Sequence, residues 1–443
     1  MHFGSLSLGL EKVTILMRKY AELFHTKGLV KTALAAAFAR LATTMIPVAL
    51  VLAVIGAGFS VELAGFTAGA YALGNAVGNP TQGRLVDRFA PISVFCSSSV
   101  VLGVSLSIVG LRGSELSPFT IIMCAVLGGL STSPVGASMR ALWPTLLPAG
   151  ELRQRAFTFE STLSEFLFIL GPAVVALVSM LWDPQIALLL ATMLFVVGAI
   201  GFSTSGLVRS IHRQRTVVVA SARTPPSASR RIALAAIMTS IGLTAALSSA
   251  VFVAVTGFMQ YIHAPLEIGV VGLSLQSTGS VVGGVIYGTF VWNSSSLTRY
   301  IRVLSVLTLG LATIPIAFFL AQFGVDVTIV IAVLIAALLL SGIPIAPAGS
   351  EEFQLVGEVV PPNSTNLAFA SVGSFIAIGT ATGSAVVGFI AERFGVFAGL
   401  LLPSIFAALA LALSVITRRH ILRAITELRM NTLATNAEKL EAS

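Results

Sequence analysis

Residues 78–88 read Gly-Asn-Pro-Thr-Gln-Gly-Arg-Leu-Val-Asp-Arg and are the most informative stretch of this chain. They are polar and charged, yet they lie between two long apolar runs, at residues 45–77 and 92–111. Glycine, proline and asparagine in such a position favour a tight turn. The sequence therefore predicts that the chain leaves an apolar environment here for only a few residues and then re-enters it.

The composition places most of the chain in lipid. Charged residues make up 10% of the sequence, compared with about 25% in soluble domains. Hydrophobic residues make up 56%, and the mean hydropathy is +0.96. A helix needs about 20 apolar residues to cross a bilayer. Twelve stretches meet this requirement and predict an all-α membrane protein with twelve transmembrane helices: 30–56, 60–82, 92–111, 118–143, 157–181, 184–207, 232–258, 266–291, 299–320, 326–348, 363–389 and 394–416.

The basic residues indicate how the chain is oriented. With a cytoplasmic N-terminus, most of the 26 Lys and Arg residues fall on one side of the membrane, in the two terminal segments and in the loops after spans two, four, six and eight. Short basic loops stay in the cytoplasm. We therefore expect both termini to be cytoplasmic. The net charge of +8 then reflects topology and contact with membrane lipids rather than binding of nucleic acid.

Residues 208–231 form the clearest linker. They carry six arginines, a Pro225-Pro226 pair and small polar residues, a composition that cannot form a compact core. The linker separates two predicted six-helix bundles. The expected organisation is a cytoplasmic N-terminal segment (1–29), an N-terminal bundle (30–207), the cytoplasmic linker (208–231), a C-terminal bundle (232–416) and a cytoplasmic tail (417–443).

The glycines and tryptophans follow this arrangement. Gly74, Gly78 and Gly83 in the second span have counterparts 205 residues later, in the eighth span, at Gly279, Gly283 and Gly288. This repeat is typical of transporters built from two related halves. The three tryptophans, Trp143, Trp182 and Trp292, lie at predicted span ends, as expected of an aromatic belt at the membrane interface.

The loop after the second span resembles the signature motif of the major facilitator superfamily. Gly83, Leu85, Asp87 and Arg88 match the motif, with Arg84 at a variable position, whereas Ala90 and Pro91 replace its final glycine and basic residues. The resemblance implies a monomeric secondary transporter in the cell membrane that carries a small molecule by alternating access. It also implies that Gly83, Arg84, Asp87 and Arg88 act as a latch that stabilises the outward-open state.

Three charged residues fall inside the spans of the N-terminal half: Arg40, Glu160 and Glu165. An unpaired charge in the bilayer is costly, so we expect partners. Arg40 and Glu165 have similar predicted depths and form the natural pair, while Glu160 could reach Arg140 or Arg155. Burial favours the neutral form of a carboxyl group and a nearby arginine favours the charged form. These residues are therefore candidates for proton coupling, with a purely structural ion pair as the alternative.

Arg140 has two interpretations. It lies in a stretch, Met139-Arg140-Ala141-Leu142-Trp143-Pro144, that resembles the arginine-bearing fourth span of proton-coupled family members. It also lies near the predicted end of its span, where an arginine can extend to the interface. We keep it as a candidate for proton coupling.

The C-terminal half shows no charge inside its predicted spans, because Glu351 and Glu352 fall at the end of span ten. The candidate substrate contacts there are Gln260, Gln276 and Ser341. Few polar donors for hydroxyl groups and no paired arginines for phosphate are visible. An apolar or cationic substrate therefore fits this sequence better than a sugar or a phosphate ester.

Other function classes fit less well. The chain lacks the Gly-x-x-x-x-Gly-Lys-Ser/Thr loop of an ATP-driven pump, and its five histidines lie in predicted tails or loops. We expect no enzyme, no cofactor and no metal site. The preferred function is proton-coupled efflux by proton antiport. The alternatives are an uncoupled facilitator and a transporter-like membrane scaffold or sensor.

Overall fold

The computed structural model describes residues 28–147, 150–210, 227–361 and 364–441, and these residues are largely helical. The expected N-terminal segment 1–29 and the linker 208–231 lie mostly outside the described residues. Their course therefore stays a prediction from the sequence.

The N-terminal bundle comprises spans one to six. Its helices are α2 (Leu29–Gly56), α3 (Val61–Arg88), α4 (Pro91–Arg112), α5 (Pro118–Leu130), α6 (Val135–Leu146), α7 (Glu151–Leu181) and α8 (Pro184–Thr204). The helices α5 and α6 together form span four. The extensive contacts of α2 with α8, and of α3 with α5, build the interior of this bundle.

The C-terminal bundle comprises spans seven to twelve. Its helices are α10 (Ala228–Tyr261), α11 (Leu266–Tyr287), α12 (Ser296–Leu311), α13 (Ile316–Gln322), α14 (Val327–Gly342), α15 (Ile345–Val359), α16 (Thr365–Phe394) and α17 (Val396–Ile416). Span nine consists of α12 and α13, and span ten of α14 and α15. A last helix, α18 (Arg418–Glu441), buries Ile421, Ala424 and Ile425 and packs mainly against α10.

The twelve predicted spans coincide with helices, but several helices are longer than expected. α7 begins at Glu151 instead of 157, and α15 continues to Val359 instead of ending near 348. In the described part of the chain, ten helical segments are long and apolar enough to cross a membrane. α3 and α11, with 28 and 22 residues, complete the twelve.

Prolines mark the interruptions of spans four, nine and ten. Pro134, Pro315 and Pro344 stand just before α6, α13 and α15, and proline cannot donate the backbone hydrogen bond that a continuous helix requires. In span four the side chain of Gln82 compensates. Its Nε2 donates to the carbonyl oxygens of Leu130 (2.6 Å) and Thr132 (3.3 Å), which the break leaves without helical partners.

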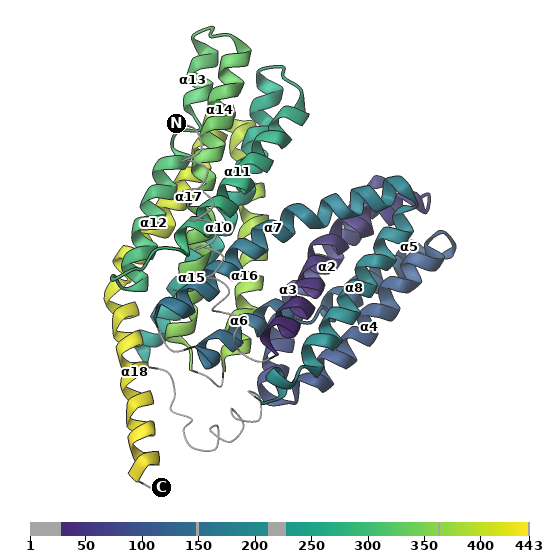
Figure 1. Cartoon of the computed structure of the whole chain (residues 1–443). Helices are drawn as coiled ribbons and strands as arrows, with labels where there is room; N and C mark the ends of the chain where they lie inside the picture. Colours follow the sequence, from purple (N-terminus) through teal and green to yellow (C-terminus); the bar gives the residue numbers. More distant parts are fainter. Residues whose placement is uncertain (1–27, 148–149, 211–226, 362–363, 442–443) are drawn as a thin grey trace, which may run out of the picture.

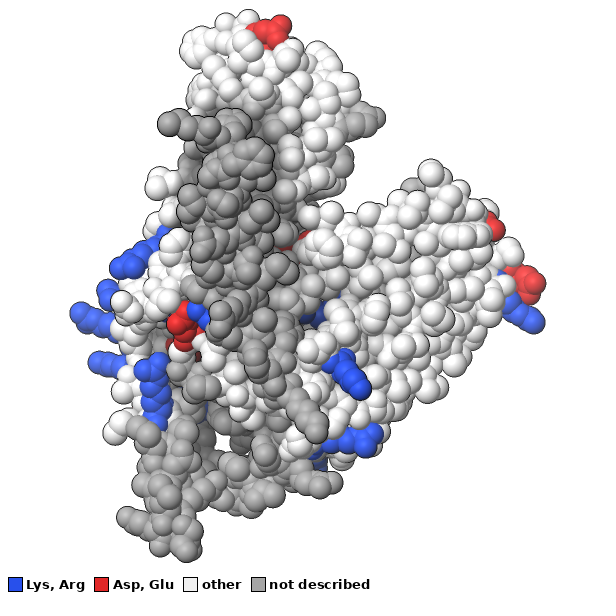
Figure 2. Space-filling view, viewed as in Figure 1, with Lys and Arg blue, Asp and Glu red and all other residues white. Residues whose placement is uncertain are grey.

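The two bundles are close together at one end and apart at the other. Figure 1 shows them meeting around α6, α7, α15 and α16 and diverging toward the far ends of α5, α11 and α13. In the space-filling view the notch between the far ends is open (Figure 2). We call the closed end, which carries Arg84, Arg88, Arg153, Arg302 and the start of α18, the basic end, and the other the open end.

The glycine repeat corresponds to equivalent helix contacts in the two bundles. A Cβ atom on Gly74 or Gly78 would collide with the backbone of α5, and one on Gly279 or Gly283 would collide with the backbone at the end of α14. Small residues let helices approach closely in a membrane. The repeat therefore reflects the same close packing of span two on span four and of span eight on span ten.

This packing yields a prediction for two glycines of the same helix. Gly78→Ala places a methyl group against the carbonyl of Leu130, whereas a Cβ atom on Gly69 meets nothing within 4 Å. We expect Gly78→Ala to destabilise the protein by about 1–3 kcal/mol through overpacking and Gly69→Ala to leave stability unchanged. Melting temperatures of the two purified variants test this; equal values would contradict the assigned helix contact.

Candidate functional site: the closed end and its buried charges

The signature residues Gly83–Arg88 join the two bundles at the basic end. The sequence predicted a tight turn at residues 78–88, but these residues form the last turns of α3, which ends at Arg88. α16 begins at Thr365, and its own N-cap residue, Ser364, makes no side-chain cap. Asp87, at the end of α3, supplies the cap instead. Its carboxylate accepts hydrogen bonds from the backbone N–H groups of Asn366 (3.3 Å) and Leu367 (2.8 Å) and from Nδ2 of Asn366 (2.7 Å). A negative charge at a helix N-terminus is also favoured by the helix dipole.

Gly83 allows the same two helices to approach. A Cβ atom on Gly83 would lie 2.7 Å from Cβ of Ala370 and 3.0 Å from the carbonyl oxygen of Asn366. One turn beyond Ala370 on α16, Ser374 donates to the carbonyl oxygen of Ala76, about two turns before Gly83 on α3, at 2.7 Å. Arg84 and Arg88 are exposed, and the guanidinium of Arg88 lies over the ring of Phe89. Gly83 and Asp87 thus make the contact between the bundles, while the two arginines face outward.

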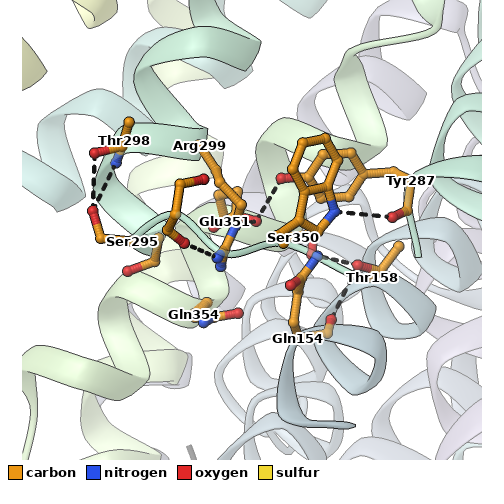
Figure 3. A network of polar contacts seen from close by, with 12 residues as sticks. Gln154, Thr158, Tyr287, Ser295, Thr298, Arg299, Ser350, Glu351 and Gln354 are labelled. Atoms are coloured by element: carbon orange, nitrogen blue, oxygen red, sulfur yellow. Dashed lines mark hydrogen bonds and ion pairs between the residues drawn. The ribbon is translucent and has the colours of Figure 1, made fainter. Parts of the chain in front are cut away.

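A second contact between the bundles joins α7 to α15. The hydroxyls of Thr158 and Ser350 share a hydrogen bond of 2.7 Å, and the Ser161 hydroxyl donates to the carbonyl oxygen of Ala346 at 2.8 Å. Figure 3 shows Ser350 directed to Thr158 of α7, while its neighbour Glu351 is directed to Arg299 of α12. This contact consists of neutral hydroxyl and carbonyl groups, in contrast to the charged contact at Asp87.

Arg40 does not pair with Glu165, contrary to the expectation from depth. Arg40 Nη1 donates to Oε2 of Glu160 at 2.7 Å, and both side chains are buried, with 8% and 1% exposed. Arg40 Nη2 also binds the carbonyl oxygen of Glu160 and the hydroxyl of Ser164. Successive helical residues are rotated by about 100°, so Glu165 lies about 140° around α7 from Glu160. Depth alone could not distinguish these two faces.

Glu160 has two further partners. Nε of Arg140 lies 4.0 Å from its Oε2, and Nε1 of Trp143 donates to its Oε1 at 3.2 Å. Trp143 is fully buried, so it is not the interfacial residue that the sequence suggested. Arg155, the other expected partner of Glu160, binds Glu151 instead. Glu160 of α7 therefore binds side chains of two other helices, α2 and α6, and holds the three helices together.

Arg140 connects this cluster to the C-terminal bundle. Its guanidinium carbon lies 4.2 Å above the centroid of the Phe353 ring of α15, a cation–π geometry. Arg140 therefore faces Glu160 on one side and the other bundle on the other. It is not an arginine that extends to the membrane interface.

Glu165 lies close to the middle of the 31-residue helix α7 and is only partly buried. Among the residues that the structure describes, its carboxylate has no hydrogen bond or ion pair. This environment differs sharply from that of Glu160, five residues earlier. Among the described residues, the carboxylate of Glu165 is thus not engaged by another side chain, unlike that of Glu160.

The C-terminal bundle also contains buried charges, which corrects the sequence-based expectation. Oε1 of Glu351 accepts from Nε of Arg299 at 2.8 Å and from the hydroxyl of Tyr287 at 2.7 Å. Glu352 accepts from the hydroxyls of Thr244 (2.8 Å) and Tyr300 (2.9 Å). The sequence carried a usable signal, because no proline follows Glu351 until Pro361. Extending span ten to that proline would have placed both carboxylates inside it.

The three expected substrate contacts do not come together. Nε2 of Gln276 donates to the hydroxyl of Ser341 at 3.2 Å, and both residues are buried in the contact between α11 and α14. Gln260 is exposed near the open end of α10. In this conformation Gln276 and Ser341 are part of the packing between α11 and α14, and their role as substrate contacts stays a prediction. Within the described residues, no group of three or more His, Cys, Asp or Glu side chains could hold a metal ion.

The Glu160 cluster yields a stability prediction. Glu160→Gln removes the negative charge that compensates two buried arginines, and breaking a buried pair in this way costs about 3–5 kcal/mol. The matched control is Glu115→Gln, since Glu115 pairs with Arg112 at 3.6 Å with both side chains mostly exposed, and such pairs contribute less than about 1 kcal/mol. Thermal unfolding of both variants should show a large loss only for Glu160→Gln; similar losses would refute the assigned cluster.

The Asp87 cap yields a prediction for conformation. Asp87→Asn keeps the shape of the side chain but removes the charge that α16 binds. We expect the basic end to open more often, so that a cysteine introduced at Ser374 reacts faster with a water-soluble maleimide, in a background with Cys96→Ser and Cys124→Ser. Asp183→Asn, at the open end, is the control. An unchanged labelling rate for Asp87→Asn would contradict a role of this cap in closure.

The comparisons with known proteins agree with this architecture. No curated protein matches the chain. Among solved structures, it is similar to a bacterial homologue of the iron transporter ferroportin in an outward-facing state (TM-score 0.67, 13% identity, 89% of this chain and 100% of that chain). It is also similar to the human organic anion transporter MFSD10 (0.64, 15%, 87% and 98%) and to the proton:xylose symporter XylE (0.60, 13%, 87% and 94%).

At sequence identities of 13–15% the similarity to these structures shows the fold alone. Membership in a family is shown by the match of the sequence to a family model. Residues 32–350, which span the first nine transmembrane segments and most of the tenth, match the Major Facilitator Superfamily. The matched region includes Gly83–Arg88, the residues whose resemblance to the family motif is described above. The twelve-helix fold, the two bundles and this match together show that the chain belongs to the major facilitator superfamily of membrane transporters.

Proposed function

We propose that this chain is a secondary active transporter of the cell membrane that exports a small apolar or cationic compound in exchange for protons. Membrane transport follows from the family. The exchange with protons rests on Glu165. A carboxylate near the middle of a membrane span, partly exposed and without a partner among the described residues, can bind either a proton or a cationic group.

A single carboxylate that serves both ligands produces exchange. Glu165 cannot hold a proton and a substrate cation with full affinity at the same time, because protonation removes the charge that attracts the cation. Arrival of a proton therefore releases the substrate, and departure of the proton restores the site. With a proton gradient directed into the cell, this competition drives the substrate outward.

In this proposal the basic end faces the cytoplasm, as the excess of Lys and Arg there favours. The conformation described is then closed to the cytoplasm and open to the outside. The Asp87 cap on α16 and the hydroxyl contact between Thr158 and Ser350 are the contacts that must break for the cytoplasmic side to open. Alternating access requires such contacts to form and break in each cycle.

The Arg40–Glu160 pair has a structural role in this proposal. The buried carboxylate of Glu160 is already bound by Arg40, Arg140 and Trp143. A ligand could therefore reach it only by displacing one of these side chains. Arg140 contacts both Phe353 of α15 and Glu160, so a movement of α15 would also move this cluster. We therefore assign proton exchange to Glu165 and retain Arg40, Glu160 and Arg140 as the framework that positions α7.

Transport of a lipophilic cation tests the proposed role of Glu165. Purified full-length protein is reconstituted in liposomes with an acidic lumen, and uptake of tetraphenylphosphonium is measured with and without an ionophore that collapses the pH gradient. We expect Glu165→Gln to lower the gradient-driven uptake by at least about tenfold, equivalent to about 1.4 kcal/mol.

Glu392→Gln is the matched control, because Glu392 is an exposed carboxylate of α16 near the open end. It should retain full uptake. Gradient-driven uptake by Glu165→Gln equal to that of the unmodified protein would remove Glu165 from the mechanism. Uptake by the unmodified protein that ignores the gradient would indicate an uncoupled facilitator.

A further inference from the structure

Glu352 of α15 is a buried carboxylate whose hydrogen-bond partners are hydroxyl groups. Its Oε1 accepts from Thr244 Oγ1 of α10 at 2.8 Å and from the Tyr300 hydroxyl of α12 at 2.9 Å. Behind Tyr300, the hydroxyl of Ser240 lies 2.7 Å away. Among the described residues no cation pairs with Glu352. Its neighbour Glu351, about 100° around the helix, is bound by Arg299 instead.

A carboxylate in this position calls for an explanation. An ionised group buried without a cation is costly, and apolar residues of similar size would pack there more favourably. Ionisable residues inside membrane spans therefore point to a function. The Arg299–Glu351 pair balances its own charges and leaves none for Glu352.

The hydrogen bonds around Glu352 can be satisfied with or without a proton on it. Thr244 Oγ1 carries one hydrogen but lies within hydrogen-bond distance of two acceptors, the carbonyl oxygen of Ile241 (2.9 Å) and Oε1 of Glu352 (2.8 Å). When Glu352 is ionised, Thr244 donates to the carboxylate. When Glu352 is protonated, Thr244 donates to Ile241 and accepts the proton of Glu352. Rotation of one hydroxyl thus interconverts two complete networks.

Glu352 is also connected to an accessible surface and to the contact between the bundles. Thr244 is partly exposed, and Ser248, one turn further along α10, is exposed and donates to the Thr244 carbonyl oxygen. On α15, the neighbours of Glu352 contact the other bundle. Ser350 binds Thr158, and Phe353 lies under Arg140. Glu352 therefore lies in the same turn of α15 as the residues that contact the N-terminal bundle at the basic end.

We propose that Glu352 is a second proton-binding site, located in the C-terminal bundle, and that its protonation state controls how α15 is seated against α7. The inference rests on the proposed proton coupling and extends it from Glu165 to the other bundle. Several helices packed against α15 present charged, titratable or hydroxyl groups near Glu352: Ser240 and Thr244 from α10, Tyr287 from α11, Arg299 and Tyr300 from α12, Arg140 from α6, Thr158 and Ser161 from α7, and Glu351 and Glu358 on α15 itself. Helices α16 and α18 also pack against α15, and none of their described side chains forms a hydrogen bond or ion pair with Glu352. Of the two arginines, Arg299 pairs with Glu351. Arg140 lies over the ring of Phe353 and next to Glu160.

The experiment measures the separation of the bundles as a function of pH. Spin labels are attached at Ser93→Cys on α4 and Arg302→Cys on α12, two exposed positions at the basic end of different bundles, in full-length protein with Cys96→Ser and Cys124→Ser. Electron–electron distance distributions are recorded in lipid nanodiscs across the pH range in which carboxyl groups titrate.

We expect the distribution to shift with pH in this labelled protein and in the control Glu392→Gln. Glutamine resembles a protonated glutamate, so Glu352→Gln should lose the shift and show the low-pH distribution at every pH, whereas Glu352→Asp should retain a shift. A pH-dependent shift in Glu352→Gln equal to that of the control would overturn the inference, as would a labelled protein without any shift.

Melting temperatures ensure that the distances report on folded protein. The hydroxyl partners of Glu352 can also bond to an amide, so Glu352→Gln should fold. The inference and the proposed function fail in different measurements. If uptake of tetraphenylphosphonium by the unmodified protein does not depend on the pH gradient, the proposed function is contradicted. If Glu352→Gln retains the pH-dependent shift in distance, the second proton-binding site is contradicted.

Discussion

The carboxylate of Asp87 accepts hydrogen bonds from the first turn of α16, a helix of the opposite bundle, and this contact joins the two bundles at the basic end. Each bundle has its own packed interior, with glycines that hold span two against span four and span eight against span ten. The bundles can therefore persist as units while their mutual contacts change. Asp87 is only partly buried, so water can compete with α16 for its carboxylate.

The carboxylates inside the membrane spans divide into two groups with different surroundings. Glu160 and Glu351 are each paired with an arginine and further fixed by Trp143 or Tyr287. Such pairs hold helices in register and are strongly destabilised when one partner is removed. Glu165 and Glu352 have no cationic partner among the described residues. Each bundle thus combines a carboxylate paired with an arginine and one without a cationic partner, and the carboxylates without a cationic partner are the ones that we propose for proton exchange.

The sequence was sufficient for the fold and for the family because both depend on patterns along the chain. Apolar length fixes the number of spans, and the motif at Gly83–Arg88 lies within a few consecutive residues. Pairing across helices depends on rotation as well as on depth. Arg40 was therefore assigned to Glu165, although the face of α7 that it meets carries Glu160.

The C-terminal charges were missed for a different reason. Span ten was ended at its last strongly apolar residues, whereas the helix continues through Glu351 and Glu352 to Val359. These carboxylates are tolerated because Tyr287, Arg299 and Tyr300, from other helices, bind them. Such compensation arises only in the folded bundle and has no signature in the local sequence. The same holds for Gln276 and Ser341, which are polar but satisfy each other.

The most direct test of the account locks the two bundles together at the basic end. The hydroxyls of Thr158 and Ser350 are 2.7 Å apart, so Thr158→Cys combined with Ser350→Cys, in a background with Cys96→Ser and Cys124→Ser, can form a disulfide between α7 and α15. If transport requires these helices to separate, oxidation should abolish gradient-driven uptake of tetraphenylphosphonium in proteoliposomes and reduction should restore it, while the single-cysteine variants stay active. Full uptake by the oxidised, cross-linked protein would contradict the account.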